Sequence, residues 1–356
     1  MHQKILNSDD ASAWNRLLGK VDKKCIYYTP EFARIAESHF KGVSELFFYG
    51  DENNYVVYPY LKKRVNELPF FSDVEEVFYD ISSFEYGGPA LHCQDKSMEK
   101  ELFSNFIDAF HSYCLKANIV TEFARLHPIF GNHMLLQEKN PQNVKEIHDI
   151  VYVDLTEPEE TIWANFDKEN RKAIRKAKRD GVTVEIAEDR NAVEEFRRLY
   201  TMNMDKWGAR KEYHFSVDYF ERLLKEMDGN ATLFVSKHNG KIVVGSLLLH
   251  KFDIAYDYLR GADPDFLGYR PNNLIVYEII KWAKKAGYKY FVMGGGYKSN
   301  DSIFRFKSLF SKKTKPFYRY SFIHNNEAYE FLCDAFRRKA QALEPDFFPL
   351  YRSPVE

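Results

Sequence analysis

The segment YKYFVMGGGYKSNDSIFRFKSLF, Tyr288–Phe310, joins a strand pattern, a glycine turn and an aromatic, cationic run. Tyr288–Met293 is rich in β-branched and aromatic residues and is followed by glycine, which predicts a strand. Gly294–Gly296 ends it, because consecutive glycines allow positive φ and let another chain or a ligand lie against bare backbone. Asp301–Phe310 predicts a loop or short helix whose rings hold Lys307 near the turn. A sheet end followed by a surface helix with solvated lysines is the alternative.

The composition is that of a globular protein with two domains. The chain has 356 residues, of which 45% are hydrophobic and 29% charged, and its net charge is −1. Any anion site must therefore be local. The four cysteines lack CxxC spacing, no His/Cys/Asp cluster has metal spacing, and neither a signal peptide nor a membrane span is indicated. We expect a cytoplasmic protein with buried thiols and no metal, meeting any membrane-bound substrate from the cytoplasmic side.

The order of predicted elements in the second half repeats that in the first. A helix, a strand, a turn and a strand are predicted in Phe32–Leu61 and again in Phe220–His250, 188 positions later (220 − 32). A long amphipathic helix and a strand follow in each half, in Met98–Leu126 and in Asn272–Met293. This order predicts an internal duplication, with two unrelated α/β domains as the alternative.

The second half also contains the pattern of a phosphate site. A strand predicted at Phe252–Arg260 leads to a loop with Gly268 and Arg270, and Pro271 starts a helix. Free N–H groups and a partial positive charge at a helix start accept an anion, and Arg270 would add a charge-assisted contact. An ordinary helix start that binds nothing is the alternative.

A basic segment, Asp167–Gly181, lies between the two halves. Helical spacing puts Arg171, Arg175 and Lys178 on one face of the helix that it predicts. Seven cations against three acids stand out from an otherwise balanced chain. Most charge runs are solvated faces, but this one is a candidate for binding an anion or an RNA backbone.

Taken in order, these parts resemble the FemABX-like acyltransferases, which are built from two fused GNAT-like domains. The likeness runs from about Tyr27 to Tyr320. Its residues in the second half are Asn170–Gly181, Leu199–Met204, Tyr213–Phe215, Pro271–Asn273, Gly294–Gly296 and Phe306–Phe310. Those in the first half are Tyr28–Phe32, Tyr86–Pro89 and Arg125–Pro128.

The resemblance implies an α/β fold of two GNAT-like domains, each a mixed, mostly antiparallel twisted sheet flanked by helices. Residues 1–155 would form the N-terminal domain on the acceptor side, and 156–345 the C-terminal domain on the donor side. Residues 346–356 would form a tail. The larger enzymes that build peptidoglycan bridges carry a helical-hairpin arm, for which this sequence has no room.

Such proteins form amide bonds. Some take aminoacyl groups from tRNA to peptidoglycan precursors, and others would use acyl-CoA. The missing arm and the near-zero net charge favour an N-acyltransferase that uses acyl-CoA as the donor and has no tightly bound cofactor. Its acceptor would be an amine of a cell-envelope or surface-glycan precursor. An aminoacyl-tRNA-dependent aminoacyltransferase acting on a peptidoglycan precursor is the alternative. The expected partners are a small-molecule or lipid-linked glycan or peptide acceptor, tRNA under the alternative, and no DNA, with a peripheral contact at the inner membrane.

The resemblance and the local patterns together assign roles to particular residues. Lys307 would stabilise the oxyanion or a donor phosphate, and Tyr258 would carry a proton or donate to the carbonyl. The residues assigned to donor binding are Gly268, Arg270, Asn272, Asn273, Arg171 and Arg175. The residues assigned to the acceptor are Glu85, Tyr86 and Phe306.

Each of these residues has a structural alternative. A buried Tyr is more often a packed ring than a catalyst, and Glu85 could cap a turn. No Ser or Cys occupies a nucleophile elbow, which argues against a covalent acyl-enzyme. A non-catalytic RNA-binding module centred on Arg171–Arg179 and a catalytically dead scaffold are the alternatives of other classes.

Overall fold

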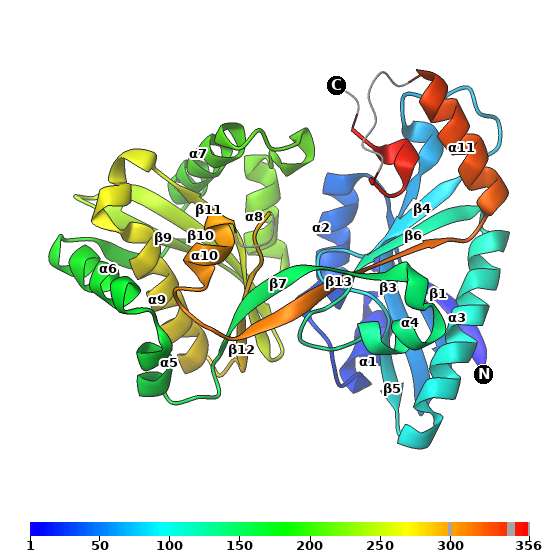
Figure 1. The fold of residues 1–356 in the computed structure, drawn as a ribbon, viewed down its shortest axis with the longest axis horizontal. Coiled ribbons are helices and arrows are strands. Elements are labelled where there is room, and N and C mark those ends of the chain that lie inside the picture. The colour runs from blue at the N-terminus through cyan, green and yellow to red at the C-terminus, as the bar shows by residue number, and fades with distance from the viewer. Residues whose placement is uncertain (298–300, 340–345, 355–356) are drawn as a thin grey trace. The chain divides into compact units, whose positions relative to one another are not determined.

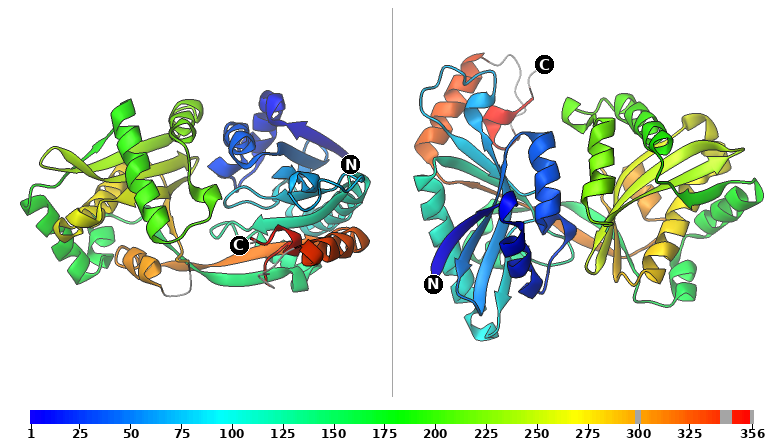
Figure 2. Two further views of the ribbon diagram at one scale, coloured as in Figure 1. Left: turned by 90° about the horizontal axis from the view of Figure 1, so that it is seen from above. Right: turned by 180° about the vertical axis from the view of Figure 1, so that it is seen from behind.

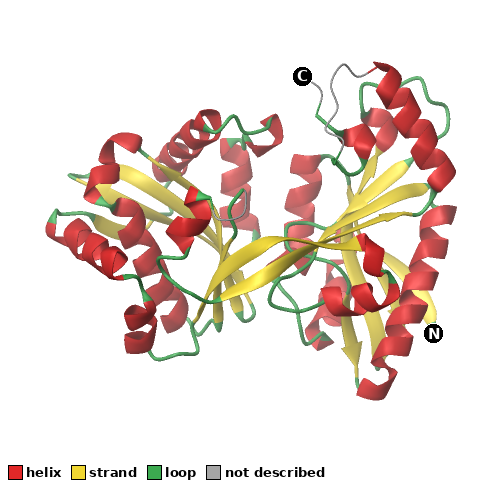
Figure 3. Cartoon of the chain, in the orientation of Figure 1, coloured by secondary structure: helices red, strands yellow, loops and turns green. Residues whose placement is uncertain are grey.

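The computed structural model describes residues 1–297, 301–339 and 346–354 (Figure 1). The chain divides into two compact units. Unit 1 contains Met1–Ile147 and Phe317–Glu356, and unit 2 contains His148–Pro316. In each unit, helices flank the strands of a mixed sheet (Figure 3).

The strands of unit 1 follow the order β1-β2-β3-β4-β6-β13, and β5 pairs with β3. Helices α1 and α2 (blue) lie on one face and α3 (cyan) on the other (Figure 2). The strands are β1 (His2–Asn7), β2 (Val43–Gly50), β3 (Asn54–Arg64), β4 (Tyr79–Ser82), β5 (Ala90–Cys93), β6 (Ile119–Arg125) and β13 (Thr314–Ile323). The helices are α1 (Ala11–Lys20), α2 (Pro30–Phe40), α3 (Glu99–Lys116), α4 (His133–Lys139) and α11 (Asn326–Lys339).

The strands of unit 2 follow the order β7-β12-β11-β10-β9-β8. They are β7 (Val144–Asp154), β8 (Thr183–Ile186), β9 (Ala231–His238), β10 (Lys241–Lys251), β11 (Ile254–Ala262) and β12 (Tyr290–Gly294). The helices are α5 (Glu159–Asn165), α6 (Lys168–Arg179), α7 (Arg190–Lys206), α8 (Val217–Glu226), α9 (Pro271–Lys285) and α10 (Ser302–Lys307).

Two glycines let α7 approach one face of the unit 2 sheet. A Cβ on Gly261 would lie 2.3 Å from the nitrogen of Tyr200, and one on Gly245 would lie 2.4 Å from the ring of Phe196. On the other face, Val244 and Leu248 of β10 belong to the apolar core that also contains the buried side of α9. Helices α7 and α8 therefore cover one face, and α9 with α6 covers the other.

The two units repeat the same strand pairing, as the order of elements predicts. Strands β1 to β4 are antiparallel neighbours in unit 1, and β8 to β11 are antiparallel neighbours in unit 2. A long helix then leads to a strand that pairs in parallel, β6 with β4 and β12 with β11. The predicted turn at Asn239 and Gly240 has φ values of 50° and 77°, which this short hairpin requires.

The last strand of each half pairs in the other unit. β7 follows β6 along the chain but pairs antiparallel with β12, with Asp154 opposite Tyr290. β13 follows β12 but pairs antiparallel with β6, with Arg319 opposite Arg125. Duplicated sheets have equivalent open edges, so an edge strand can be completed by either copy.

This exchange makes the compact units differ from the predicted domains. The predicted boundary at 155/156 falls after β7, whereas unit 1 ends within β7, at Ile147. The segment from Phe317 onward, predicted in the C-terminal domain, belongs to unit 1. Residues 340–345 and 355–356 of the predicted domain and tail lie outside the described residues.

The described part of the predicted tail packs into unit 1. Leu350 and Tyr351 are buried in an apolar cluster with Leu332 and Phe336 of α11. The hydroxyl of Tyr351 donates a hydrogen bond to the buried carboxylate of Asp80 at 2.5 Å. Leu350 and Tyr351 of the predicted tail are thus part of a core.

Candidate active site

The pairing of β11 with β12 ends early and is followed by a bulge. β12 pairs with β11 only along Ile254–Tyr256, and β11 then continues to Ala262. On its other side β11 pairs with β10, where Asp257 lies opposite Leu248 and Leu259 lies opposite Leu247. Tyr258 is the extra residue of this bulge. Bulges re-aim side chains and are frequent next to active sites.

The bulge brings Asp257 and Arg260 onto one face of β11. Residues three positions apart in a regular strand point to opposite faces. Here their partners on β10 are Leu248 and Ser246, which share the face covered by α9. Arg260 Nη2 donates to Asp257 Oδ2 at 2.5 Å, and Ser246 Oγ donates to Asp257 Oδ1 at 3.2 Å. The side chains of Arg260 and Asp257 are only 16% and 7% exposed.

The same bulge turns Tyr258 toward the other face. Its hydroxyl lies 2.7 Å from the hydroxyl of Tyr219 on α8, within hydrogen-bonding distance. The two predicted catalytic residues therefore approach β11 from different faces, since Lys307 lies on the α9 side. The role of Tyr258 as a proton carrier stays a prediction.

Lys307 is held at the glycine turn, where the sequence places it. It ends α10, which begins where the carboxylate of Asp301 accepts the N–H of Phe304 at 2.8 Å. The ammonium of Lys307 donates to the carbonyl of Gly295 at 2.6 Å. A Cβ on Gly295 would lie 2.3 Å from the ring of His148, so the turn requires bare backbone. Residues 298–300 lie outside the described residues.

Burial and the neighbouring carboxylates act on the pKa of Lys307 in opposite directions. Burial lowers its pKa from the ordinary 10.5 to about 8, and the charge of Arg260 adds to this lowering. The carboxylates of Asp257 and Asp301 oppose it. A lysine with a pKa of about 8 is still mostly protonated at neutral pH, so it can stabilise negative charge.

Phe306 connects Lys307 to β11. The guanidinium of Arg260 lies 5.8 Å from the centroid of the Phe306 ring, within the range of a cation–π contact. The Phe306 ring packs edge-on against Phe310, which is buried. The buried Nε–H of Arg260 has no hydrogen-bond acceptor among the described residues. Phe306, Lys307, Asp257 and Arg260 therefore form one cluster.

A buried asparagine joins this cluster to α6 and α9. Asn170 of α6 is 1% exposed, and its amide donates to the carbonyl of Leu309 at 3.1 Å. Its own carbonyl accepts the amide of Asn273 on α9 at 2.8 Å. The side-chain amide of Asn273, which is predicted to bind the donor, thus donates a hydrogen bond to Asn170.

The start of α9 has few N–H groups to offer an anion. The backbone of Arg270 has a left-handed conformation, with φ of 61°. Its N–H donates a hydrogen bond to the carbonyl of Leu267. Pro271 has no N–H, and that of Asn273 donates to the carbonyl of Arg270. In the described chain this leaves the N–H of Asn272 without an acceptor in the first turn. Gly268 and the side chain of Arg270 are exposed beside it.

The predicted basic helix, α6, uses its arginines differently. Arg171 Nη1 donates to the carbonyl of Ala164 at 2.8 Å and to that of Phe166, so it closes the end of α5. Arg175 is exposed, and its guanidinium lies 5.6 Å from the ring centroid of Trp163. An exposed basic stripe on α6 consists of Lys168, Lys172, Arg175 and Arg179.

The predicted acceptor residues Glu85 and Tyr86 belong to unit 1. A carboxylate oxygen of Glu85 lies 3.8 Å from Arg125 Nη1. The ring of Tyr86 contacts those of Tyr27, His127 and Phe317. Burial raises the pKa of the Tyr86 hydroxyl. Their contact with the acceptor stays a prediction.

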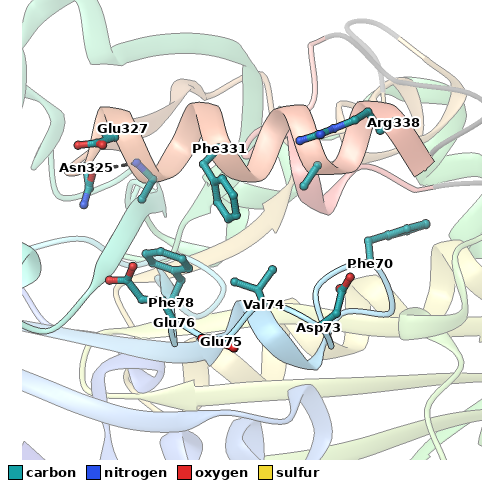
Figure 4. Close-up of a pocket in the computed structure, with 12 residues that line it drawn as sticks. Phe70, Asp73, Val74, Glu75, Glu76, Phe78, Asn325, Glu327, Phe331 and Arg338 are labelled. Carbon is teal, nitrogen blue, oxygen red and sulfur yellow. Dashed lines mark hydrogen bonds between the residues drawn. The ribbon is translucent and has the colours of Figure 1, made fainter.

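A groove of about 780 Å³ opens in unit 1 between α11 and the loop that contains Val74 (Figure 4). Figure 4 shows Phe331 of α11 facing Val74 and Phe78 across it. The predicted site residues do not line it. The groove is therefore separate from the Lys307 cluster.

Membrane spans and metal ligands are two further features on which the sequence raises expectations. Within the described ranges, no helix has the length and apolarity needed to cross a membrane. In the same residues no three His, Cys, Asp or Glu side chains come together as a metal site.

Sequence reasoning missed Asp257, Arg260 and Asn170. The first two had a readable signal, because they are charged residues within the otherwise apolar strand pattern of IAYDYLRGA, Ile254–Ala262. Asn170 had none, since a polar residue in a basic helix resembles any solvated position. Its burial depends on α9 and on Leu309, far along the chain.

Three comparisons place the chain among known proteins. Residues 164–308 match the family model of the acetyltransferase (GNAT) domain. The UDP-N-acetylmuramoylpentapeptide-lysine N(6)-alanyltransferase of Weissella viridescens is 25% identical over 150 residues, which span 41% of this chain and 44% of that protein. The aligned part is thus less than half of that relative.

Solved structures extend the likeness to nearly the whole chain. The crystal structure of FemX matches with a TM-score of 0.70 at 16% identity, covering 93% of this chain and 99% of FemX. The C-terminal domain of a putative lysylphosphatidylglycerol synthetase from Agrobacterium fabrum matches with a TM-score of 0.53 at 15% identity, covering 90% and 93%. The predicted fold of two fused GNAT-like domains is confirmed. Residues 164–308 thus match the acetyltransferase (GNAT) domain family, and the chain as a whole has a fold similar to that of FemX.

Proposed function

We propose that the protein is an N-acyltransferase that joins an aminoacyl group to an amine of a peptidoglycan precursor. One observation carries the proposal: Lys307, which is partly buried and donates to the Gly295 carbonyl, lies beside the bulge of β11 where pairing with β12 ends. A cation that is already oriented stabilises an oxyanion without reorganising during the reaction.

The reaction needs a neutral amine, a cation and a leaving group. The amine nitrogen bonds to the carbonyl carbon of the donor ester, and the carbonyl oxygen becomes an oxyanion beside the ammonium of Lys307. The bond from that carbon to the donor oxygen then breaks, and the proton of the amine passes to the departing oxygen. The products are an amide and a free hydroxyl.

Two observations favour an aminoacyl donor carried by tRNA over the acyl-CoA that the sequence favours. A compact pyrophosphate site needs several N–H groups at a helix start, and among the described residues α9 leaves only that of Asn272. The exposed basic stripe of α6 suits a donor that is held through several phosphates. The alanyltransferase of Weissella viridescens is named for the transfer of alanine to a lysine of a muramoyl pentapeptide, which supports an aminoacyl group and this class of acceptor.

An acyl-CoA donor is the second candidate, because the GNAT family model spans 164–308 and so includes the start of α9. Under this candidate Arg270 and Asn272 would hold the donor's phosphates. The acceptor would still be an amine, and Lys307 would have the same role.

The purified protein should be incubated with UDP-N-acetylmuramoyl-pentapeptide and either alanyl-tRNA or acetyl-CoA, and the products weighed by mass spectrometry. We expect a mass increase of one alanyl residue with alanyl-tRNA, abolished by RNase. Acetylation that is unaffected by RNase would favour the second candidate. Turnover with neither donor, nor with other aminoacyl-tRNAs, would contradict both.

A further inference from the structure

Lys307 has charged neighbours from two elements. Asp301 caps α10 and is occupied by backbone, since it accepts the N–H of Tyr297 at 2.6 Å as well as that of Phe304. The other two neighbours, Asp257 and Arg260, come from β11 and are paired with each other. Together they bring one negative and one positive charge close to the ammonium.

The stability of the fold does not explain why the pair is present. A buried ion pair adds little stability compared with apolar packing. Arg260 also leaves a buried Nε–H without an acceptor among the described residues, and such a group destabilises a fold. Features that break local rules in this way concentrate at functional sites.

The geometry explains why both members are needed. Asp257 alone would attract the ammonium of Lys307 into a direct ion pair and draw it away from Gly295. Arg260 occupies one oxygen of that carboxylate, and Ser246 occupies the other. Arg260 also supports Phe306, the residue before Lys307. The carboxylate can then act on Lys307 through its charge while the hydrogen bond to Gly295 remains.

We propose that Asp257 and Arg260 are positioning residues for Lys307, with the carboxylate favouring its protonated form and the guanidinium keeping that ammonium free for the oxyanion. This inference rests on the proposed role of Lys307 in acyl transfer. It assigns a function to two residues that the sequence does not single out.

The two members should shift the titration of Lys307 in opposite directions. Asp257→Asn removes a negative charge, so the pKa of Lys307 should fall by about 1 pH unit. Arg260→Gln removes a positive charge, so the pKa should rise by a similar amount. NMR of the Lys307 side chain, assigned by its loss in Lys307→Arg, measures this directly. The high-pH limb of kcat/KM should move the same way in each variant.

Two matched variants separate charge from structure. Ser246→Ala removes a hydrogen bond to the same carboxylate but no charge, so the titration should stay in place. Arg260→Lys keeps the charge and should restore most of the shift caused by Arg260→Gln. Shifts in one common direction, or none in folded variants, would overturn the inference.

The NMR titration also keeps this inference distinct from the proposed function. Opposite shifts in a protein that is inactive with every donor would support the pair and reject acyl transfer. Turnover with alanyl-tRNA but no opposite shifts would support acyl transfer and reject the pair.

Discussion

At the scale of single residues, Lys307 can be tested by a change that keeps its apolar stem. Lys307→Met removes the charge and the donor to Gly295, so we expect turnover to fall by roughly 10²-fold or more, as when an oxyanion donor is lost. The free energy of unfolding should change by only about 1 kcal/mol, since one hydrogen bond is removed. Steady-state kinetics and urea unfolding measure the two effects. Lys312→Met, on the exposed neighbouring lysine, is the control, and equal kinetics for both variants would dismiss the role.

The lowered pKa of Lys307 also predicts how stability depends on pH. The pKa of Lys307 is about 8 when folded and near the ordinary 10.5 when unfolded, so the unfolded chain binds more protons between these values. The free energy of unfolding should therefore rise with pH across this window, relative to Lys307→Met, and this relative gain should level off outside it. Chemical unfolding of both proteins at several pH values gives the difference. A difference that is constant from pH 8 to pH 10.5 would contradict the prediction.

At the scale of elements, Asn170 ties α6 to α9 and to Leu309, in the turn that follows α10. Asn170→Ala leaves the carbonyl of Leu309 and the amide of Asn273 without a buried partner, which should destabilise the protein by about 1–3 kcal/mol. Turnover should fall as well, because α10 carries Lys307. Urea unfolding and kinetics on one preparation check this, with the exposed Asn165→Ala of α5 as control. A loss of stability without any change in turnover would separate α10 from this brace.

The basic stripe of α6 is the second element-scale test. Lys168→Ala with Arg175→Ala should weaken binding of alanyl-tRNA, and the slope of log affinity against log salt should flatten by roughly 0.7–0.9 for each phosphate that the variant no longer neutralises. Arg197→Ala on the exposed side of α7 is the matched control. Filter binding across a salt series gives the slopes. Affinity and slope that stay as in the unmodified protein would reject the stripe as the tRNA-binding face.

At the scale of the whole molecule, the exchange of β7 and β13 predicts how the chain can be divided. Fragment 1–155 lacks β13, so β6 loses its antiparallel neighbour. Fragment 156–356 lacks β7, so β12 loses its antiparallel neighbour. Each fragment should aggregate or unfold when expressed alone, because the backbone groups of an unpaired strand edge pair with other chains. The two fragments should become soluble when they are expressed together. Fragment 148–316 keeps β12 with its partner from β7 and is the control. Cooperative thermal unfolding of fragment 1–155 alone would contradict this.

The sequence by itself determined the features that depend on neighbours a few residues apart. The helix that is predicted to start at Pro271 does so in the structure, and the turn at Asn239 and Gly240 forms as its residue types require. The glycines beside Lys307 are where bare backbone is needed. The repeated order of elements indicated two similar domains. Periodicity, turn chemistry and glycine act locally, so a short stretch of sequence is enough to read them.

Only the tertiary structure decided which strands pair and which side chains meet. The extra residue at Tyr258 is a bulge only relative to β10, and it alone puts Asp257 and Arg260 on one face. The burial of Asn170 depends on Leu309 and Asn273, more than a hundred residues away along the chain. The exchange of β7 and β13 follows from two equivalent sheet edges, between which the order of elements cannot choose. Strand register and pairing are set by surfaces distant in sequence, and these exist only once the sheets have formed.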